Sequence, residues 1–301
     1  MYKDIKLREK NIKAAEERVS VMFQRYDGTV WGERFLPRLT SKQVKELPKE
    51  KALVILPVGA VEQHGPHLPV YTDTLIGEAT LTQTLERVRP DKEIWLLPPI
   101  SYGKSNEHIG LPGTISLSAS TLHAVMLDIA ESLKASGFRK LLLFNTHGGN
   151  VDLLNTVSRE IRIRTGMMVF YLSPSSLNVA EDLLSSEELE YGIHGGDYET
   201  SLVMSIKPDW VQKEFLVKEL PDMSSYRFLT LEGKIRFAWK MADISATGIA
   251  GDATTATPEK GRIIQDRISA ILSEALEELC DFEITDVRGT EPVQQPAGSR
   301  P

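Results

Sequence analysis

Four potential metal ligands stand close together in one short segment of the chain. Residues 57–73 read Pro-Val-Gly-Ala-Val-Glu-Gln-His-Gly-Pro-His-Leu-Pro-Val-Tyr-Thr-Asp, and the candidates are Glu62, His64, His67 and Asp73. In an extended chain Glu62 and His64 project from the same face, because they are two positions apart. Carboxylate oxygen and imidazole nitrogen together suit zinc, manganese or iron. The segment therefore predicts a metal site rather than an ordinary polar surface loop.

The overall composition favours a folded protein that acts on small molecules. Of its 301 residues, 41% are hydrophobic and 26% charged, as in ordinary globular domains. The net charge of −7 leaves no basic surplus to neutralise phosphates, which argues against a nucleic-acid or acidic-membrane partner. Cys280 is the single cysteine, so no intrachain disulfide can form. Because no apolar signal region or membrane-length apolar stretch is present, we expect a cytoplasmic protein.

Apolar strands alternate with amphipathic helices along the middle of the chain. Continuous apolar runs predict strands, and apolar positions at helical spacing predict the helices between them. The predicted strands are 52–58, 94–97, 140–144 and 167–172, and the predicted helices are 73–88, 120–136 and 151–165. This alternation favours an α/β fold of three layers, α/β/α, with a mainly parallel central sheet. Ligands of such folds bind beyond the carboxyl ends of the strands.

The unusual residues follow the predicted strands, where this fold binds its ligands. Glu62, His64 and Asp73 follow the first strand, residues 102–108 the second, and Asn-Thr-His-Gly-Gly-Asn at 145–150 the third. A further segment, His-Gly-Gly-Asp-Tyr-Glu-Thr-Ser, begins at His194. Of the six histidines, only His123 lies outside such loops, within a predicted helix. Since glycine lets the backbone approach a ligand closely, histidines gathered in glycine-bearing loops indicate a functional site.

These motifs resemble those of the creatininase family of metal-dependent amidohydrolases. Five blocks match. The first is 57–69 together with Asp73, and the second is Tyr-Gly at 102–103 together with His108 and Pro-Gly-Thr-Ile-Ser at 112–116. The third is 145–150, the fourth is 194–201, and the fifth, within 248–261, contains Gly-Ile-Ala-Gly-Asp and Ala-Thr-Pro-Glu-Lys-Gly. Ordered blocks of this length are far more specific than any single motif. We therefore expect a creatininase-like hydrolase domain over 49–284, preceded by a charged arm and connector (1–48) and followed by a disordered tail (285–301).

The resemblance implies a binuclear centre with two divalent ions per chain, zinc or manganese, with iron also possible. One ion is expected to take Glu62, Asp73 and His147. The other is expected to take His64 and Asp73, so that Asp73 bridges the pair. Carboxylates and imidazoles are ordinary ligands of these metals.

The third block departs from creatininase itself, which carries a glutamate on the second ion where this chain has Gly149. Our candidate for the missing carboxylate is Glu199, at the Glu-Thr-Ser position of the fourth block. The alternative for Glu199 is a structural role, in which it supports a strand or caps a helix. Family members with Gly-Gly in the third block act on different substrates, so the resemblance does not imply creatinine as the substrate.

The implied chemistry is attack of a metal-bound hydroxide on a carbonyl, and it needs a group that protonates the leaving atom. We predict His194 and Glu199 as catalytic residues, with His194 supplying the proton because the family pattern puts this histidine on the substrate side. Ser105, His108 and His67 are the candidate substrate contacts. The alternative for these three is that they hold loops or orient a metal ligand.

Three functions stay open at this stage. The leading expectation is hydrolysis of a small polar cyclic substrate, with a cyclic amide as the family default. The alternative is hydrolytic C–C cleavage of an oxidised inositol, a diketone of the 3-dehydro-scyllo-inosose type, on which family members with an N-terminal extension act. A non-catalytic metal-binding or sensing protein is disfavoured, because Asp73 and His147 are both retained.

The resemblance also implies a ring-like homo-hexamer built from dimers. The charged N-terminal arm, with Trp31 and Phe35, is expected to offer surface for contacts between subunits.

Overall fold

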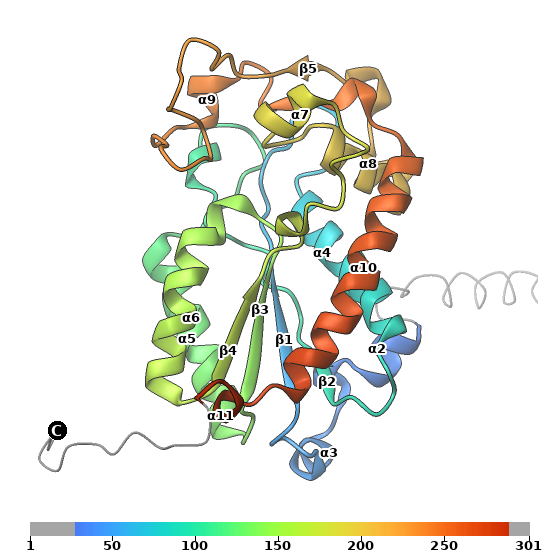
Figure 1. Cartoon of the computed structure of the whole chain (residues 1–301), viewed down its shortest axis with the longest axis vertical. Helices are drawn as coiled ribbons and strands as arrows, with labels where there is room; N and C mark the ends of the chain where they lie inside the picture. Colours follow the sequence, from blue (N-terminus) through green and yellow to red (C-terminus); the bar gives the residue numbers. More distant parts are fainter. Residues whose placement is uncertain (1–27, 289–301) are drawn as a thin grey trace, which may run out of the picture.

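The computed structural model describes residues 28–288 (Figure 1). The predicted tail falls largely on 289–301 and the charged arm largely on 1–27, which lie outside the described residues. The strands are β1 (Leu53–Val58), β2 (Ile94–Leu96), β3 (Lys140–Asn145), β4 (Met168–Leu172), β5 (Lys218–Glu219) and β6 (Gly251–Asp252). The helices are α2 (Thr29–Glu33), α3 (Ser41–Glu46), α4 (Thr72–Arg87), α5 (Ala119–Ala135), α6 (Val151–Thr165), α7 (Ser186–Tyr191), α8 (Asp197–Ile206), α9 (Met241–Ile244), α10 (Pro258–Asp281) and α11 (Ile284–Arg288).

The central sheet has four parallel strands in the order β2-β1-β3-β4. Strand β1 lies inside the sheet and is buried along its whole length, as its continuous apolar run predicts. It pairs with β3 from Leu53 opposite Lys140 to Val58 opposite Asn145, so the carboxyl ends of both strands lie at the same level. The predicted parallel α/β architecture is confirmed.

Helices cover both faces of the sheet and complete the three layers (Figure 1). Side chains of β1 alternate between two apolar cores, since successive residues of a strand point to opposite faces. Val54 and Leu56 pack in the core beneath α5 and α6. Leu53 and Ile55 pack in the core formed with α4, α8 and α10. Local signals end the helices where the sequence predicts, for example at Gly166, which closes α6 with φ 69°.

Trp31 and Phe35 do not offer the subunit-contact surface expected of them. They are only 8% and 9% exposed, and their rings meet edge to face at 5.1 Å within the chain's own core. Their segment runs along the edge of the sheet, where the Leu96 amide donates to the carbonyl of Arg34 at 2.8 Å. Arg34 and Phe35 pair with β2, and both rings of the segment pack in the core beside α4, where they make apolar contacts.

The segments between β4 and α10 lie beyond the carboxyl ends of the strands (Figure 1). They include the short helices α7, α8 and α9 and the antiparallel pair β5–β6. Within residues 28–288, no helix is both long and apolar enough to cross a membrane.

Candidate metal centre

Side chains from three segments converge beyond the ends of β1 and β3. His147, which follows β3, places Nδ1 3.2 Å from Glu62 Oε1 and 3.4 Å from Asp73 Oδ2. His64 places Nε2 3.3 Å from Asp73 Oδ1. The parallel pairing of β1 with β3 brings their following loops together. The structure thus gathers Glu62, His64, Asp73 and His147. His67, the remaining candidate of residues 57–73, faces Thr200 instead.

Asp73 offers its two carboxylate oxygens to two different histidines. Oδ1 faces His64 and Oδ2 faces His147. The residue is buried in the first turn of α4, where the helix dipole favours a negative charge. An aspartate with this geometry can serve two cations at once.

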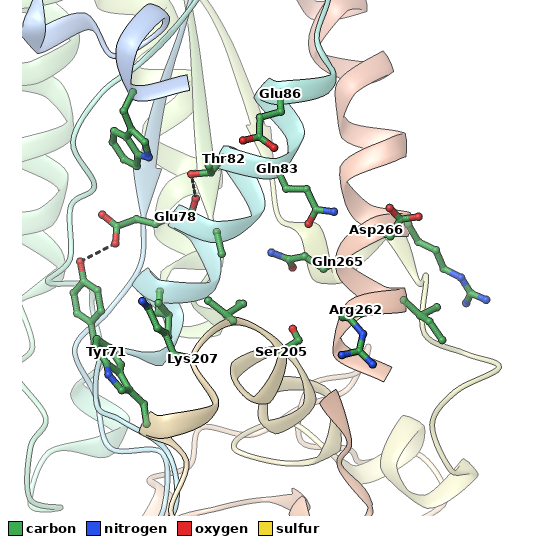
Figure 2. A pocket seen from close by; sticks show the side chains of 17 residues that line it. Tyr71, Glu78, Thr82, Gln83, Glu86, Ser205, Lys207, Arg262, Gln265 and Asp266 are labelled. Atoms are coloured by element: carbon green, nitrogen blue, oxygen red, sulfur yellow. Dashed lines mark hydrogen bonds between the residues drawn. The ribbon is translucent and has the colours of Figure 1, made fainter. Parts of the chain in front are cut away.

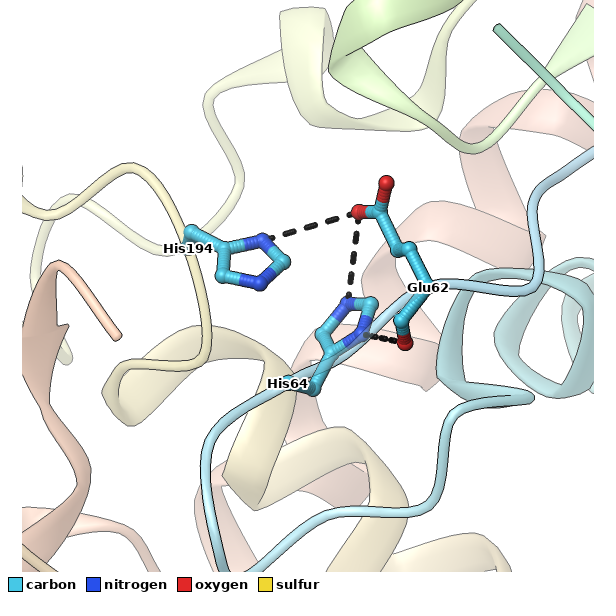
Figure 3. Close-up of side chains that lie close together, drawn as sticks. All are labelled: Glu62, His64 and His194. Atoms are coloured by element: carbon cyan, nitrogen blue, oxygen red, sulfur yellow. Dashed lines mark hydrogen bonds and ion pairs between the residues drawn. The ribbon is translucent and has the colours of Figure 1, made fainter. Parts of the chain in front are cut away.

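Glu199 and His194 join the cluster from the start of α8 and the segment before it. Glu199 Oε2 lies 3.8 Å from His64 Nε2 and accepts a hydrogen bond from the Gly195 amide at 2.6 Å. His194 is fixed by a backbone bridge to Ala250 and places Nδ1 3.7 Å from Glu62 Oε1 (Figure 3). Glu199 and His194 therefore add a carboxylate and an imidazole to the cluster.

Backbone contacts turn the unprotonated nitrogens of two histidines toward the cluster. His64 Nδ1 donates to the carbonyl of Glu62 at 3.1 Å, which leaves the lone pair of Nε2 facing Asp73. His147 Nε2 donates to the carbonyl of Lys104 at 3.1 Å, which leaves the lone pair of Nδ1 inside the cluster. A histidine held through one nitrogen in this way is prepared to bind a metal with the other.

The sequence predicts no role for Gln63, yet its hydrogen bonds determine which ring nitrogen carries the proton in His108 and His194. Its amide orientation is fixed because Oε1 accepts from the Gly65 amide at 2.9 Å and Nε2 donates to the carbonyl of Gly248 at 2.7 Å. Nε2 also donates to His108 Nδ1 at 2.8 Å, so the proton of His108 sits on Nε2, which faces Glu62 at 3.8 Å. His194 Nε2 donates to the carbonyl of Gln63 at 2.7 Å and keeps Nδ1 as an acceptor.

Three buried polar atoms of the cluster have no hydrogen-bond partner among the described residues. They are Glu62 Oε2, His64 Nε2 and Asp73 Oδ2. Leaving buried polar atoms unpaired is costly, and native proteins seldom do so. Candidate ligand atoms of Glu62, Asp73 and His147 lie within 4.8 Å of one another, as do those of His64, Asp73 and Glu199. Two groups that share Asp73 fit a pair of divalent cations.

Burial and mutual charge shift the pKa values of the cluster. Burial and the nearby Glu62 carboxylate raise the pKa of Asp73 to about 6. Burial alone would raise the pKa of Glu199, but His64 and the Gly195 amide lower it to about 2. Burial, with the charge of His64, lowers the pKa of His194 to about 3. These shifts follow from carboxylates and imidazoles crowded into one buried cluster.

The three residues predicted to contact substrate do not line the cavity beside the cluster, and each contacts another residue of the protein. Ser105 Oγ is 3.2 Å from His147 Nε2, and His108 faces Glu62. His67 Nε2 lies 2.9 Å from Thr200 Oγ1, and burial lowers its pKa to about 4. None of the three is among the residues that line the cavity beside the cluster, and their contact with substrate stays a prediction.

Glu107 is a second residue to which sequence reasoning gave no role. Its Oε1 lies 3.6 Å from His147 Nε2, and its carboxylate groups with Glu62 and His108 as a possible ligand set. The signal in the sequence was its place next to His108 in a loop that follows a strand.

A cavity of about 710 Å³ opens beside the cluster. His147, His194 and Glu199 are among its lining residues, and most of the others belong to the β4–α8 connection. The lining contains glutamates and no lysine or arginine. This charge pattern favours neutral or cationic substrates over anionic ones.

A larger hollow of about 1180 Å³ lies at the C-terminal end of α8, between α4 and α10 (Figure 2). Glu78, Gln265 and Arg262 are among its lining residues, but no member of the metal cluster is. We therefore assign the chemistry to the smaller cavity, because catalysis needs substrate within reach of the polar cluster.

The parallel sheet and the buried donor cluster at its carboxyl end define a metal-binding α/β protein. The family model described as creatinine amidohydrolase matches residues 37–276, which is most of the chain. The chain belongs to the creatininase family of hydrolases, and its expected resemblance to that family is confirmed.

Relatives with different activities resemble the chain at similar levels. The mycofactocin precursor peptide peptidase of Mycolicibacterium smegmatis is 33% identical over 75% of this chain and 83% of its own length. The creatinine amidohydrolase of Pseudomonas putida is 29% identical over 81% and 96%. The 3-dehydro-scyllo-inosose hydrolase of Thermotoga maritima is 27% identical over 62% and 60%.

Solved structures of creatininase share the fold. A crystal structure of creatinine amidohydrolase aligns with a TM-score of 0.68 at 28% identity, over 83% of this chain and 98% of that one. A manganese form of creatininase aligns with a TM-score of 0.65 at 27% identity, over 82% and 98%. A variant of creatininase is described as a Zn–Zn type.

Proposed function

We propose that this chain hydrolyses an amide bond of a small polar substrate with the help of two divalent ions. The observation that carries the proposal is the position of Asp73, whose two oxygens face His64 and His147 at 3.3 and 3.4 Å. Glu62 and His147 would hold one ion with Asp73, and His64 and Glu199 would hold the other. Zinc or manganese suits this donor set, and iron is also compatible.

When bound, the ions supply an acidified water and polarise the substrate carbonyl. The residues of the chain do the rest. His194 lines the cavity, and its Nδ1 is free to accept a proton because Nε2 donates to the Gln63 carbonyl. Because burial lowers its pKa to about 3, it holds a proton only transiently, taking it from the attacking water and giving it to the leaving nitrogen. Glu199 also lines the cavity and would bind the second ion together with His64.

Amide cleavage is preferred because two relatives are named for it. One is a peptide peptidase at 33% identity and the other is a creatinine amidohydrolase at 29%. A cyclic amide is our first substrate class. The cavity of about 710 Å³ is within the range of ordinary ligand sites and is roomy enough for a short peptide as well.

Hydrolytic C–C cleavage of an oxidised inositol is the second candidate. It is favoured by the inosose hydrolase relative, at 27% identity. Attack of water on a carbonyl begins both reactions, so the same metal ligands serve either one. A neutral polyhydroxylated ring also suits a cavity whose lining contains no lysine or arginine.

A metal-loaded activity screen distinguishes the candidates. The apoprotein is reconstituted with Mn²⁺ or Zn²⁺ and offered creatinine and other cyclic amides, short peptides and a diketo-inositol, with products identified by mass spectrometry. We expect C–N cleavage that depends on metal. Cleavage of the diketone alone would establish the second candidate, and metal binding without turnover of any class would leave a binding or sensing protein.

We further propose that the protein works in the cytoplasm as a homo-oligomer, a hexamer by analogy with the family. Exposed apolar side chains between β5 and α9 support an assembly surface: Tyr226, Phe228, Ile235 and Phe237 are all exposed. The net charge of −7 supports a small-molecule substrate rather than nucleic acid or an acidic membrane.

A further inference from the structure

Glu107 approaches the outer nitrogen of His147, Nε2, while Nδ1 of the same ring faces Glu62 and Asp73. Its Oε1 lies 3.6 Å from Nε2 of His147, whereas Nδ1 of the same ring faces Glu62 at 3.2 Å. Only 14% of the Glu107 side chain is exposed. The imidazole is therefore flanked by a carboxylate at each of its nitrogens.

Gly149 leaves the room in which the carboxylate and the imidazole meet. A Cβ at this position would overlap Glu107 Oε1 and would lie 2.5 Å from both His147 Nε2 and the carbonyl of Lys104. No side chain can occupy residue 149 unless this group moves apart. Glu107, from the loop after β2, thus fills space that a side chain at 149 would need.

We propose that Glu107 is a positioning residue of the metal centre: its negative charge reinforces the Lys104 carbonyl in holding the proton of His147 on Nε2, and so keeps the lone pair of Nδ1 for a divalent ion. The inference rests on the proposed metal centre. Carboxylates commonly contact the outer nitrogen of a metal-binding histidine, where they fix its tautomer and raise its basicity. Ser105 and the Lys104 carbonyl approach the same nitrogen as uncharged acceptors, so the negative charge comes from Glu107.

The contact with Lys104 does not account for the position of Glu107. Lys104 Nζ lies 3.2 Å from Oε2, whereas the oxygen turned toward His147 is Oε1. Lys104 is more exposed than its partner, at 30% against 14%. Its ammonium holds one oxygen from the solvent side and leaves the other directed into the site.

The test compares Glu107→Gln, which keeps the shape and removes the charge, with Glu107→Asp and with Glu46→Gln on the exposed face of α3 as the matched control. Affinity for Zn²⁺ and Mn²⁺ is measured by competition with a chelator, and metal per chain is measured at saturation. We expect Glu107→Gln to weaken the affinity of one ion by roughly 10- to 100-fold with the saturated metal content unchanged. Glu107→Asp should recover part of the affinity, and Glu46→Gln should match the unsubstituted protein.

The stability of the metal-free protein separates positioning from a purely structural role. We expect the melting temperature of the Glu107→Gln apoprotein to stay close to that of the unsubstituted apoprotein. Unchanged metal affinity would overturn the proposal. So would the loss of one whole ion at saturation, because that result marks a direct ligand.

The readout is independent of turnover, so this proposal and the proposed function fail separately. Weaker metal binding in Glu107→Gln without any detected hydrolysis would uphold the positioning role while the function fails. Normal metal binding in Glu107→Gln together with intact hydrolysis would overturn the positioning role and leave the proposed function standing.

Discussion

At the scale of single residues, the site depends on which atom each side chain presents. Glu199 presents Oε2 to His64 at 3.8 Å while the Gly195 amide holds the same oxygen at 2.6 Å. The amide contact alone would be an ordinary helix-start interaction. The approach to His64 favours a ligand role, and substitution can separate the two.

We predict that Glu199→Gln lowers the metal content toward one ion per chain. An amide is a far poorer ligand for zinc or manganese than a carboxylate is. The measurement is elemental analysis after dialysis, with Glu190→Gln on the exposed surface of α7 as the matched control. Two ions retained in the Glu199 variant would assign that residue to the helix start instead.

We predict that His194→Asn keeps its metal but loses turnover. The substitution replaces the imidazole with an amide, which accepts a hydrogen bond but cannot carry the proton, and loss of a general acid or base typically lowers kcat by about 10²- to 10⁴-fold. Metal content and kcat are measured on the same preparation. If the variant releases metal, then His194 is a ligand, in keeping with its grouping with Glu62 and His64 (Figure 3), and His108 becomes the next proton donor to test.

At the scale of elements, the short segments before α4 and α8 decide whether the ligands meet. The backbone turns sharply at Gly65 and Gly195, with φ of 68° and 64°. A Cβ at Gly195 would lie 2.7 Å from Ile249 Cγ2, next to the bridge between His194 and Ala250. Both conformation and space therefore require glycine at this turn.

We predict that Gly195→Ala destabilises the fold by about 1–3 kcal/mol, the cost typical of a strained backbone position. Gly148→Ala is the control, because a Cβ there meets no atom within 4 Å and its φ is not positive. Urea unfolding of both apoproteins measures the difference. Equal stability of the two variants would mean that the segment relaxes without cost.

At the scale of the whole molecule, metal binding and folding are linked. The cluster joins residues from β1 through α8, so ions bind only when these elements are in place. We predict that chelation lowers the melting temperature, because a ligand bound only to the folded state stabilises it. Differential scanning calorimetry with and without a chelator tests this, and equal melting temperatures would argue against a resident metal.

The same linkage fixes the direction of the pH dependence. The metal-free pKa of Asp73 is raised to about 6, so below that pH a proton competes with the ions for this carboxylate. Metal affinity should therefore fall as the pH drops through about 6.

Assembly is the remaining prediction at this scale. Phe228 is 67% exposed and Ile235 56% exposed, on the segment that precedes α9. We expect light scattering to give the mass of an oligomer at micromolar concentration, and Phe228→Asp to lower it, because burying a charge at an apolar interface is unfavourable. A monomeric mass for the unsubstituted chain would contradict the proposal.

The sequence alone determined the four strands of the central sheet, the three helices between them (α4, α5 and α6), and the loops that carry Glu62, His64, Asp73 and His147. It did not predict the elements after β4, among them the long helix α10. The predicted features are local: an apolar run predicts a strand, helical spacing predicts a helix, and the polar residues follow directly. Parallel pairing then places their loops at one edge of the sheet, which is why the fold class could be predicted together with the neighbourhood of the site.

The tertiary structure alone decided the fine arrangement. Gln63 fixes its amide through Gly248, 185 positions away, and so sets which nitrogen of His108 carries a proton. Glu107 meets His147 only because two loops approach each other at Gly149. Trp31 and Phe35 are buried because their segment pairs with the sheet edge. Contacts between distant segments depend on register and packing, which no local pattern of residue types records.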